Sequence, residues 1–240
     1  MTTFKRLFVF LFFPLAAPLL SCTASIDGIV REGGSADITI SAAVEPRTVA
    51  LILSIRGFMG GAADAPILDG PAITGSMIAA PGVISASFVN AGPTALNGNL
   101  SISNVGDFLI AGDAEGQFIT FTEGATAGAS SITINLDRSS APGLISRLSP
   151  ELAEYLSALM APVILGEAMS RQEYIGLVTM VYGRLLADEL AAARIRASIQ
   201  FPRTITAVQG GTATGNRAEF DIPLLDLLVM EQPLRYEVRW

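Results

Sequence analysis

Apolar and polar residues alternate with a period of two over much of the chain, which predicts β-strands with one buried face. Residues 37–42, Asp-Ile-Thr-Ile-Ser-Ala, are the first clear case, and residues 26–30 precede them across a glycine turn at 32–34. A short turn between two such runs predicts a hairpin. Further strand-like runs, separated by glycine-containing turns, lie at 83–89, 100–103, 108–110, 118–121 and 132–136. Together these runs predict a largely antiparallel sheet.

A period of 3.6 residues replaces this alternation between residues 149 and 195. Ser149-Pro150-Glu151 is typical of a helix start, with a capping serine, a proline in the first turn and an acid near the positive end of the helix dipole. Ser170 and Glu173 have the spacing of a capping box and open a second helix. The apolar stripe of the first helix consists of Leu152, Tyr155, Leu156, Leu159, Met160, Val163 and Ile164. Residues 149–195 therefore predict a helical hairpin, joined near Gly166.

Three other segments complete the expected fold. Pro46 suits a first helical turn and predicts a shorter helix over about 46–56. Residues 57–82 form a lobe rich in Gly and Ala, for which a helical piece near 67–77 and a mobile apolar lobe are both open. The chain then ends in strands, and 235–240 alternates most regularly, which predicts that the C-terminus is paired into the sheet. We expect one α+β domain over 22–240, with the helical hairpin (about 149–195) and the shorter helix (about 46–56) packed on one face of the sheet.

The first 21 residues have the layout of a secretory signal peptide. Lys5 and Arg6 form a basic region, and an apolar stretch of about fifteen residues follows, broken by Pro14 and Pro18. A membrane-spanning helix needs about twenty apolar residues, so this stretch is short for one.

The residues that end this segment point to lipid attachment. Leu19-Leu20-Ser21-Cys22 resembles the lipobox of bacterial membrane lipoproteins. The resemblance implies that the lipoprotein signal peptidase recognises Leu19, Leu20 and Ser21, and that Cys22 becomes the N-terminus and carries diacylglycerol and an acyl chain such as palmitate. An ordinary secretory signal and an uncleaved anchor are the alternatives. Thr23 in place of an aspartate favours the outer membrane over the inner one.

The rest of the chain has a second resemblance. Gly33-Gly34 before an alternating strand, Pro81-Gly82 before another, and Gly210-Gly211 near the closing strands that end at Trp240 make it similar to small spirochaete-type envelope lipoproteins and to LppM-like lipoprotein domains. The resemblance implies an envelope domain that binds lipid or lipoglycan, and it assigns no binding residues.

Composition excludes several classes of function. Removal of Lys5 and Arg6 with the signal peptide leaves 13 of the 15 basic residues against 22 acidic ones, so we expect no nucleic-acid partner. The chain has no histidine, which excludes Ser-His-Asp catalysis and imidazole metal sites. Its one cysteine is Cys22, so a lipidated chain has no thiol for catalysis or a disulfide. We expect no cofactor, no metal and no enzymatic activity.

The remaining candidate motifs each have an ordinary structural explanation. Gly210 and Gly215 have phosphate-loop spacing, but Asn216-Arg217 follow where a Lys-Ser/Thr pair would be expected, and a strand should come next, so a hairpin turn is favoured. Asp107, Asp113 and Glu115 lack the alternation of a calcium loop. The remaining charged candidates are Asp188 and Glu189 with Arg184, Arg194 and Arg196, interpreted as a charged helix face, and Glu154, Glu167 and Asp226, which no spacing pairs.

Three functions remain open on these observations. The first is a non-enzymatic envelope lipoprotein that binds an apolar ligand or an envelope partner. The second is a structural or assembly component of the envelope, and the third is a carboxylate-based hydrolase of cell-wall glycan. Methionines and tyrosines of the helical hairpin either line a lipid cavity, form a partner groove or pack in the core, and they are Met160, Met169, Met180, Tyr155, Tyr174 and Tyr182.

Overall fold

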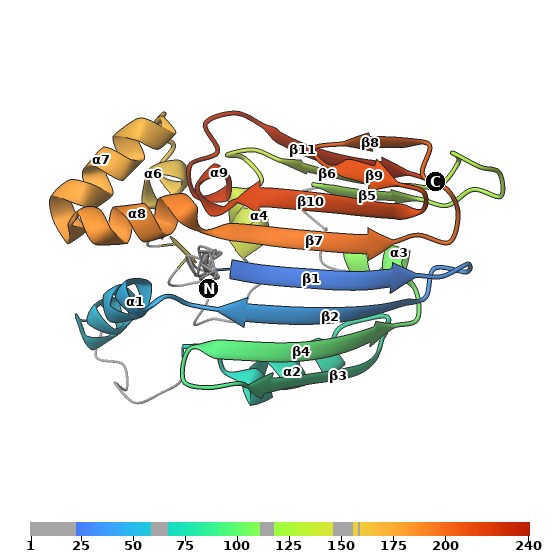
Figure 1. Cartoon of the computed structure of the whole chain (residues 1–240), viewed down its shortest axis with the longest axis horizontal. Helices are drawn as coiled ribbons and strands as arrows, with labels where there is room; N and C mark the ends of the chain where they lie inside the picture. Colours follow the sequence, from blue (N-terminus) through green and yellow to red (C-terminus); the bar gives the residue numbers. More distant parts are fainter. Residues whose placement is uncertain (1–22, 59–66, 111–117, 146–155, 158) are drawn as a thin grey trace, which may run out of the picture.

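The computed structural model describes residues 23–58, 67–110, 118–145, 156–157 and 159–240, which form two β-sheets and several short helices (Figure 1). The larger sheet has seven strands in the order β3-β4-β2-β1-β7-β10-β9. In chain order these are β1 (Thr23–Val30), β2 (Ala36–Ala43), β3 (Val83–Asn90), β4 (Ala95–Ile102), β7 (Arg194–Gln200), β9 (Thr212–Thr214) and β10 (Arg217–Pro223). All neighbouring strands are antiparallel except β1 and β7, which run parallel.

The smaller sheet has four antiparallel strands in the order β5-β6-β11-β8. They are β5 (Ile119–Thr122), β6 (Ser131–Leu136), β8 (Ala207–Gln209) and β11 (Leu234–Arg239). The last strand lies in the middle of this sheet, and Trp240 beyond it is 4% exposed. The Trp240 backbone N–H donates to the Ser130 carbonyl at 3.0 Å, which confirms that the C-terminus is paired into a sheet.

The helices lie in several places around the two sheets. They are α1 (Pro46–Phe58), α2 (Gly70–Ile78), α3 (Val105–Ile110), α4 (Ala141–Ile145), α6 (Ala161–Ile164), α7 (Arg171–Tyr182), α8 (Arg184–Ala192) and α9 (Leu224–Val229). Helix α2 packs on β3 and β4, on the same side of the larger sheet as the smaller sheet. Helices α1, α7 and α8 gather beyond one end of the strands, and this group is called the helical end below (Figure 1).

These elements confirm the α+β class with a largely antiparallel sheet, and also the helix expected near 46–56. The glycine turn between β1 and β2 is confirmed as well, with Gly33 and Gly34 at φ +82° and +80°. In the lobe 57–82, residues 59–66 lie outside the described residues, and α2 corresponds to the helical alternative at 67–77. The helix start at 149–151 also lies outside them. The apolar residues are covered by two sheets rather than one, because β5, β6, β8 and β11 pair with one another and pack on the inner face of the larger sheet.

The strand expected at residues 108–110 is wrong, because this segment belongs to α3. The Asn104 side chain accepts a hydrogen bond from the Asp107 backbone N–H at 3.1 Å, and the Asn104 carbonyl accepts from the Phe108 N–H at 3.1 Å. A side-chain acceptor at this position satisfies a helix N-terminus. The three apolar residues in a row had indicated a strand, but the capping residue Asn104, four residues before the first of them, starts a helix instead.

The second helix of the predicted hairpin is divided into α7 and α8. Its start is confirmed, since Ser170 and Glu173 form a capping box with a 3.2 Å bond from the Glu173 N–H to the serine hydroxyl. Gly183 has φ +89°, a conformation open to glycine and costly for other residues, and the helix direction changes there.

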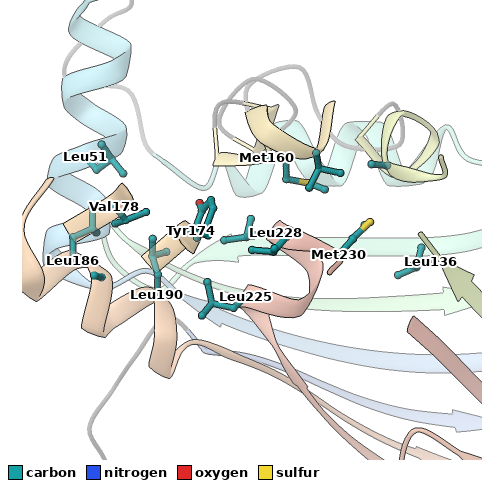
Figure 2. Packing of buried hydrophobic residues seen from close by; sticks show 14 of the residues in the cluster. Leu51, Leu136, Met160, Tyr174, Val178, Leu186, Leu190, Leu225, Leu228 and Met230 are labelled. Carbon is teal, nitrogen blue, oxygen red and sulfur yellow. The ribbon is translucent and has the colours of Figure 1, made fainter. Parts of the chain in front are cut away.

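The helical end encloses one of the hydrophobic cores (Figure 2). Met160 and Leu190 have no exposed surface, and Tyr174 from α7 is 3% exposed between them and α9. The Tyr174 hydroxyl donates to the Leu159 carbonyl at 3.0 Å. Burial raises the pKa of Tyr174 to about 12, so its hydroxyl keeps the proton that this hydrogen bond needs.

A carboxylate from α8 holds α1 in place. The Glu189 Oε2 atom accepts from the Thr48 backbone N–H at 3.0 Å and from the Thr48 hydroxyl at 3.2 Å, while Arg47 Nε lies 3.6 Å from Oε1. Thr48 is in the first turn of α1, where backbone N–H groups have no partner within the helix. The charged helix face predicted from the sequence is therefore correct for Asp188, which pairs with Arg184 at 3.7 Å, but Glu189 instead caps another helix.

We expect Glu189→Ala to lower the free energy of unfolding by about 1.5–3 kcal/mol, the range for hydrogen bonds to a charged group. Asp188→Ala is the matched control, because it removes an exposed ion pair on the same helix and should change stability by less than about 1 kcal/mol. Urea unfolding of the two variants beside the unmodified protein measures both values. Equal losses would show that Glu189 is only a surface charge.

Candidate functional site

The two sheets face each other with apolar inner surfaces that do not fill the space between them. A cavity of about 340 Å³ remains there. It is lined by isoleucines and other apolar residues from β1, β2, β7 and β10 on one side, β6 and β11 on the other, and α3 at an edge. Binding pockets for small molecules are about 300–1,000 Å³ and mostly apolar, so this cavity reaches the lower end of that range.

Small residues at the centre of the larger sheet leave this space open. Gly28 is in the middle of β1 and is paired with Ile38 of β2 and Ile199 of β7. A Cβ atom at Gly28 would lie 2.8 Å from the Ile199 Cδ1 atom, so the isoleucine leans over the glycine. Ala197, two residues before Ile199, also lines the cavity. Glycine inside a strand often marks a place where another group approaches the backbone closely.

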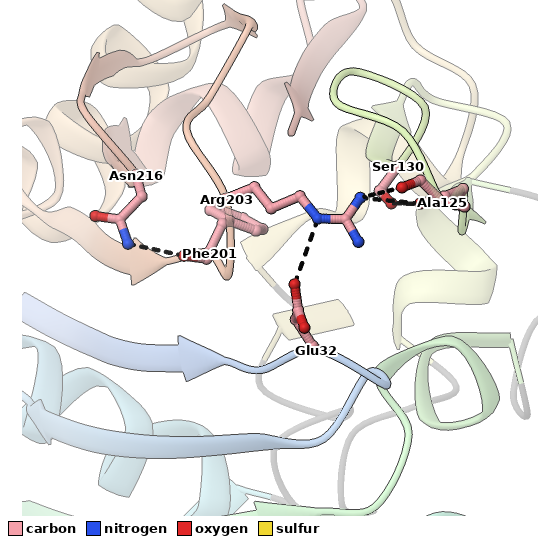
Figure 3. A network of polar contacts seen from close by, with 7 residues as sticks. Glu32, Ala125, Ser130, Phe201, Arg203 and Asn216 are labelled. Carbon is pink, nitrogen blue, oxygen red and sulfur yellow. Dashed lines mark hydrogen bonds and ion pairs between the residues drawn. The ribbon is translucent and has the colours of Figure 1, made fainter.

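The end of the sandwich away from the helical end is closed by aromatic rings and by a polar network. The rings of Phe201 and Trp240 lie 4.5 Å apart, with Phe121 6.4 Å from Trp240. Arg203 covers this group: its Nη1 atom donates to the carbonyls of Gly124 and Ala125, and its Nε atom lies 3.5 Å from Glu32 in the turn between β1 and β2 (Figure 3).

The cavity wall is apolar, and its tyrosine contributes ring atoms to it rather than the hydroxyl. Tyr236 of β11 lines the cavity and packs edge-on against Phe220, with ring centroids 5.9 Å apart. Burial, and after it the negative charge of Asp226, raise the pKa of the Tyr236 hydroxyl above its ordinary value of 10.0. The group is therefore a neutral hydrogen-bond donor and acceptor at physiological pH. Glu237 projects to the opposite face of β11, because side chains alternate along a strand.

Gly210, the first glycine of the phosphate-loop spacing, and its neighbour Gly211 make room for these two aromatic rings. The chain passes from β8 in the smaller sheet to β9 in the larger one at Gly210 and Gly211. A Cβ atom at Gly210 would lie 2.6 Å from the Tyr236 ring, and one at Gly211 would lie 2.6 Å from the Phe220 ring. Strand β10 follows Gly215 as predicted, but the short strand β9 lies within the segment that was expected to be one turn.

The methionines and tyrosines of the helical hairpin do not line this cavity. Met160 and Tyr174 are buried in the core of the helical end, and Met169 packs against it. Met180 and Tyr182 are exposed, by 80% and 53%. Tyr155 lies outside the described residues. The sequence hypothesis of a methionine-lined lipid cavity is therefore wrong about position: the apolar cavity is lined mainly by strand isoleucines, whose alternation had indicated only that one face of each strand is buried.

The candidate carboxylates do not come together in a cleft within the described part of the chain. Asp226 lies 2.8 Å from Arg171 of α7, Arg196 lies 3.8 Å from Asp221 across β7 and β10, and Glu167 and Asp107 are exposed. No group of three or more acidic, histidine or cysteine residues among the described residues could hold a metal ion.

Glu154, Asp113 and Glu115 lie outside these residues, as do Leu19, Leu20, Ser21 and Cys22, so lipid attachment stays a prediction. No helix in the described ranges is long and apolar enough to cross a membrane.

The comparisons with known proteins add one structural likeness. A scan against protein-family models found no match, and a search of curated proteins found none. The NMR structure of the folded domain of the LppM protein of Mycobacterium tuberculosis is similar to this chain, over 92% of the chain and 90% of that domain, with a TM-score of 0.41 and 10% sequence identity. A likeness of this size transfers no family, ligand or activity to this chain.

The outer face of β11 carries an ion-paired glutamate behind the cavity wall. Glu237 is paired with Arg239 and with Arg235, whose Nη2 atom donates at 2.6 Å. Hydrogen bonds from Arg235, and next from Arg239, hold the pKa of Glu237 below its ordinary value of 4.5. The folded chain therefore keeps this carboxylate ionised at pH values where the unfolded chain has already taken up the proton.

This difference predicts a pH dependence of stability. The contribution of Glu237 is complete above pH 4.5, the unfolded value, and is lost as the pH falls through the lower folded value. We expect the free energy of unfolding of Glu237→Gln to fall less steeply than that of the unmodified protein in urea titrations between about pH 6 and pH 3. Glu219→Gln, on an exposed position of β10, serves as the control. Parallel curves for the unmodified protein and Glu237→Gln would contradict the assignment, and added salt should reduce the effect, because both arginines are about half exposed.

Proposed function

We propose that this protein is a non-enzymatic lipoprotein of the cell envelope, anchored by lipid on Cys22, whose α+β domain binds an apolar ligand in the cavity between its two sheets. The cavity is the observation that carries the proposal. A ligand with hydrocarbon chains, such as a membrane lipid or the lipid part of a lipoglycan, fits walls that offer dispersion contacts and almost no hydrogen bonds.

The wall chemistry supports an apolar ligand over water. A buried water needs two to four polar partners, whereas a cavity of about 150 Å³ lined by Leu, Ile and Phe stays dry and takes up apolar molecules. The atoms that face this cavity are apolar, those of Tyr236 included, so the wall offers a ligand dispersion contacts and gives a buried water no polar partner.

The lipobox supports the envelope location. Two or three acyl chains hold a protein on a membrane where a single chain barely does, at about 0.8 kcal/mol for each buried methylene. Thr23 after the expected lipidated cysteine favours the outer membrane. A structural or assembly role without a ligand is the alternative outcome of the tests below.

The anchor is tested by the intact mass of the protein extracted from its own membranes in mild detergent. The expected species starts at Cys22 and carries diacylglycerol and an acyl chain, and Cys22→Ala should lack this mass. An unmodified chain would show a freely secreted protein, and a chain that still includes residues 1–21 would show a signal anchor.

The cavity is tested by filling it. Ala197→Leu adds a larger apolar side chain to the cavity wall, and we expect it to weaken binding of the fluorescent apolar probe N-phenyl-1-naphthylamine by at least about tenfold, or 1.4 kcal/mol. It should keep or raise thermal stability, as cavity-filling substitutions commonly do. Ala207→Leu, an exposed position of β8, is the matched control and should bind as the unmodified protein does.

Native mass spectrometry of the same three proteins reports whether lipid from the cell is retained. We expect lipid on the unmodified protein and on Ala207→Leu, and little on Ala197→Leu. Equal probe binding and equal lipid content in all three proteins would exclude the cavity as the ligand site. No binding by any of them would favour the assembly role.

A further inference from the structure

The chain enters the domain at the helical end. Thr23, the first residue of β1, is paired with Arg194 of β7 and with Ala43 of β2. Arg194 follows α8 after one intervening residue, and Ala43 lies shortly before α1. Strand β1 therefore starts beside these helices and runs away from them (Figure 1).

This same end exposes a large amount of apolar side chain. We call the helical apolar surface the group formed by Leu165 after α6, Leu177, Met180, Val181 and Tyr182 of α7, and Leu185 of α8. Their exposed fractions range from 40% for Leu177 to 80% for Met180. Scattered exposed apolar residues are ordinary, but five of these six lie on the contacting helices α7 and α8, and such a concentration marks an interaction surface.

The apolar face of α7 is wider than the part of it that the core covers. Tyr174 and Val178 face the core, as a helix of a soluble protein requires. Leu177 and Val181 lie beside this core face and Met180 lies further round the helix, yet all three side chains are at least 40% exposed. An exposed apolar surface of this kind indicates that a partner binds it, and the position of Thr23 indicates which partner.

We propose that the helical apolar surface docks on the surface of the lipid bilayer to which the N-terminus is attached. Residue 22 is directly before β1, and one residue of chain spans at most about 3.6 Å, so an anchor at Cys22 holds this end against the membrane. Tyr182 and the exposed Arg184 are side chains with an apolar body and a polar tip, which suit the interface between acyl chains and headgroups. The inference rests on the proposed membrane attachment and is independent of the cavity ligand.

A single label at Met180 in the lipidated full chain tests the docking. Lipidation uses the thiol of the one cysteine, so Met180→Cys gives a protein with one free thiol for an NBD fluorophore. Ile84→Cys is the control, because Ile84 is 67% exposed on β3 and lies at the other end of the strands from the helical end. It is next to Val83, which is paired with Ile102 at the end of β4. Both proteins are reconstituted in vesicles of phosphatidylcholine and phosphatidylglycerol that contain doxyl-labelled phosphatidylcholine as a quencher.

We expect the label at position 180 to shift its emission to shorter wavelength and to be quenched by the doxyl lipid, and the label at position 84 to behave as in water. Equal behaviour at the two positions would overturn the proposal. A blue shift at position 180 without lipid quenching, together with dimers in analytical ultracentrifugation, would also overturn the proposal. It would show that a second copy of the chain, and not the bilayer, binds the helical apolar surface. Failure of the anchor shows in the intact mass, and failure of the cavity shows in probe binding, so neither can be confused with these readouts.

Discussion

The parallel pairing of β1 with β7 is the constraint on which the rest of the arrangement depends. It is the one parallel contact between neighbouring strands of the described sheets, and it joins the first strand of the domain to a strand that follows the helices. Because the two strands point the same way, the start of β1 must lie where α8 ends. The pairing also places Gly28 opposite Ile199, so the register that fixes the entry of the chain fixes the open space between the sheets as well.

The cavity and the helical end show two different uses of apolar residues. In the helical end, Met160, Leu190 and Leu228 are packed with no exposed surface, as the interiors of stable domains are. Between the sheets, the isoleucines of β1, β7 and β10 have partly exposed side chains, since glycine and alanine beside them leave part of the volume empty. An empty volume has no partner atoms for its lining and weakens the fold, so a domain without disulfides keeps one only at a cost to stability.

Much of the fold could be predicted from periodicity, because alternation and capping are local signals. The capping box at Ser170, the turn at Gly33 and Gly34 and the closing strand to Trp240 are all encoded within a few residues. The division into two sheets could not be predicted, since pairing between distant strands has no local mark. The candidate site was missed for the same reason: Ile26, Ala197 and Ile222 are each ordinary strand residues, and only the register brings them to one cavity. Gly28 was the available signal, a glycine inside an apolar strand.

The direction and length of β1 also set how far the domain extends from the point where the chain enters it. A strand of eight residues spans roughly 26 Å at about 3.3 Å per residue. On the proposed attachment at Cys22, the start of β1 would be held at the bilayer, and the turn that contains Glu32 would stand about that far into the aqueous space, together with Arg203 and the loop at Gly124. A soluble protein of the envelope would then meet this end of the domain first, while the helical apolar surface would stay within reach of the lipid.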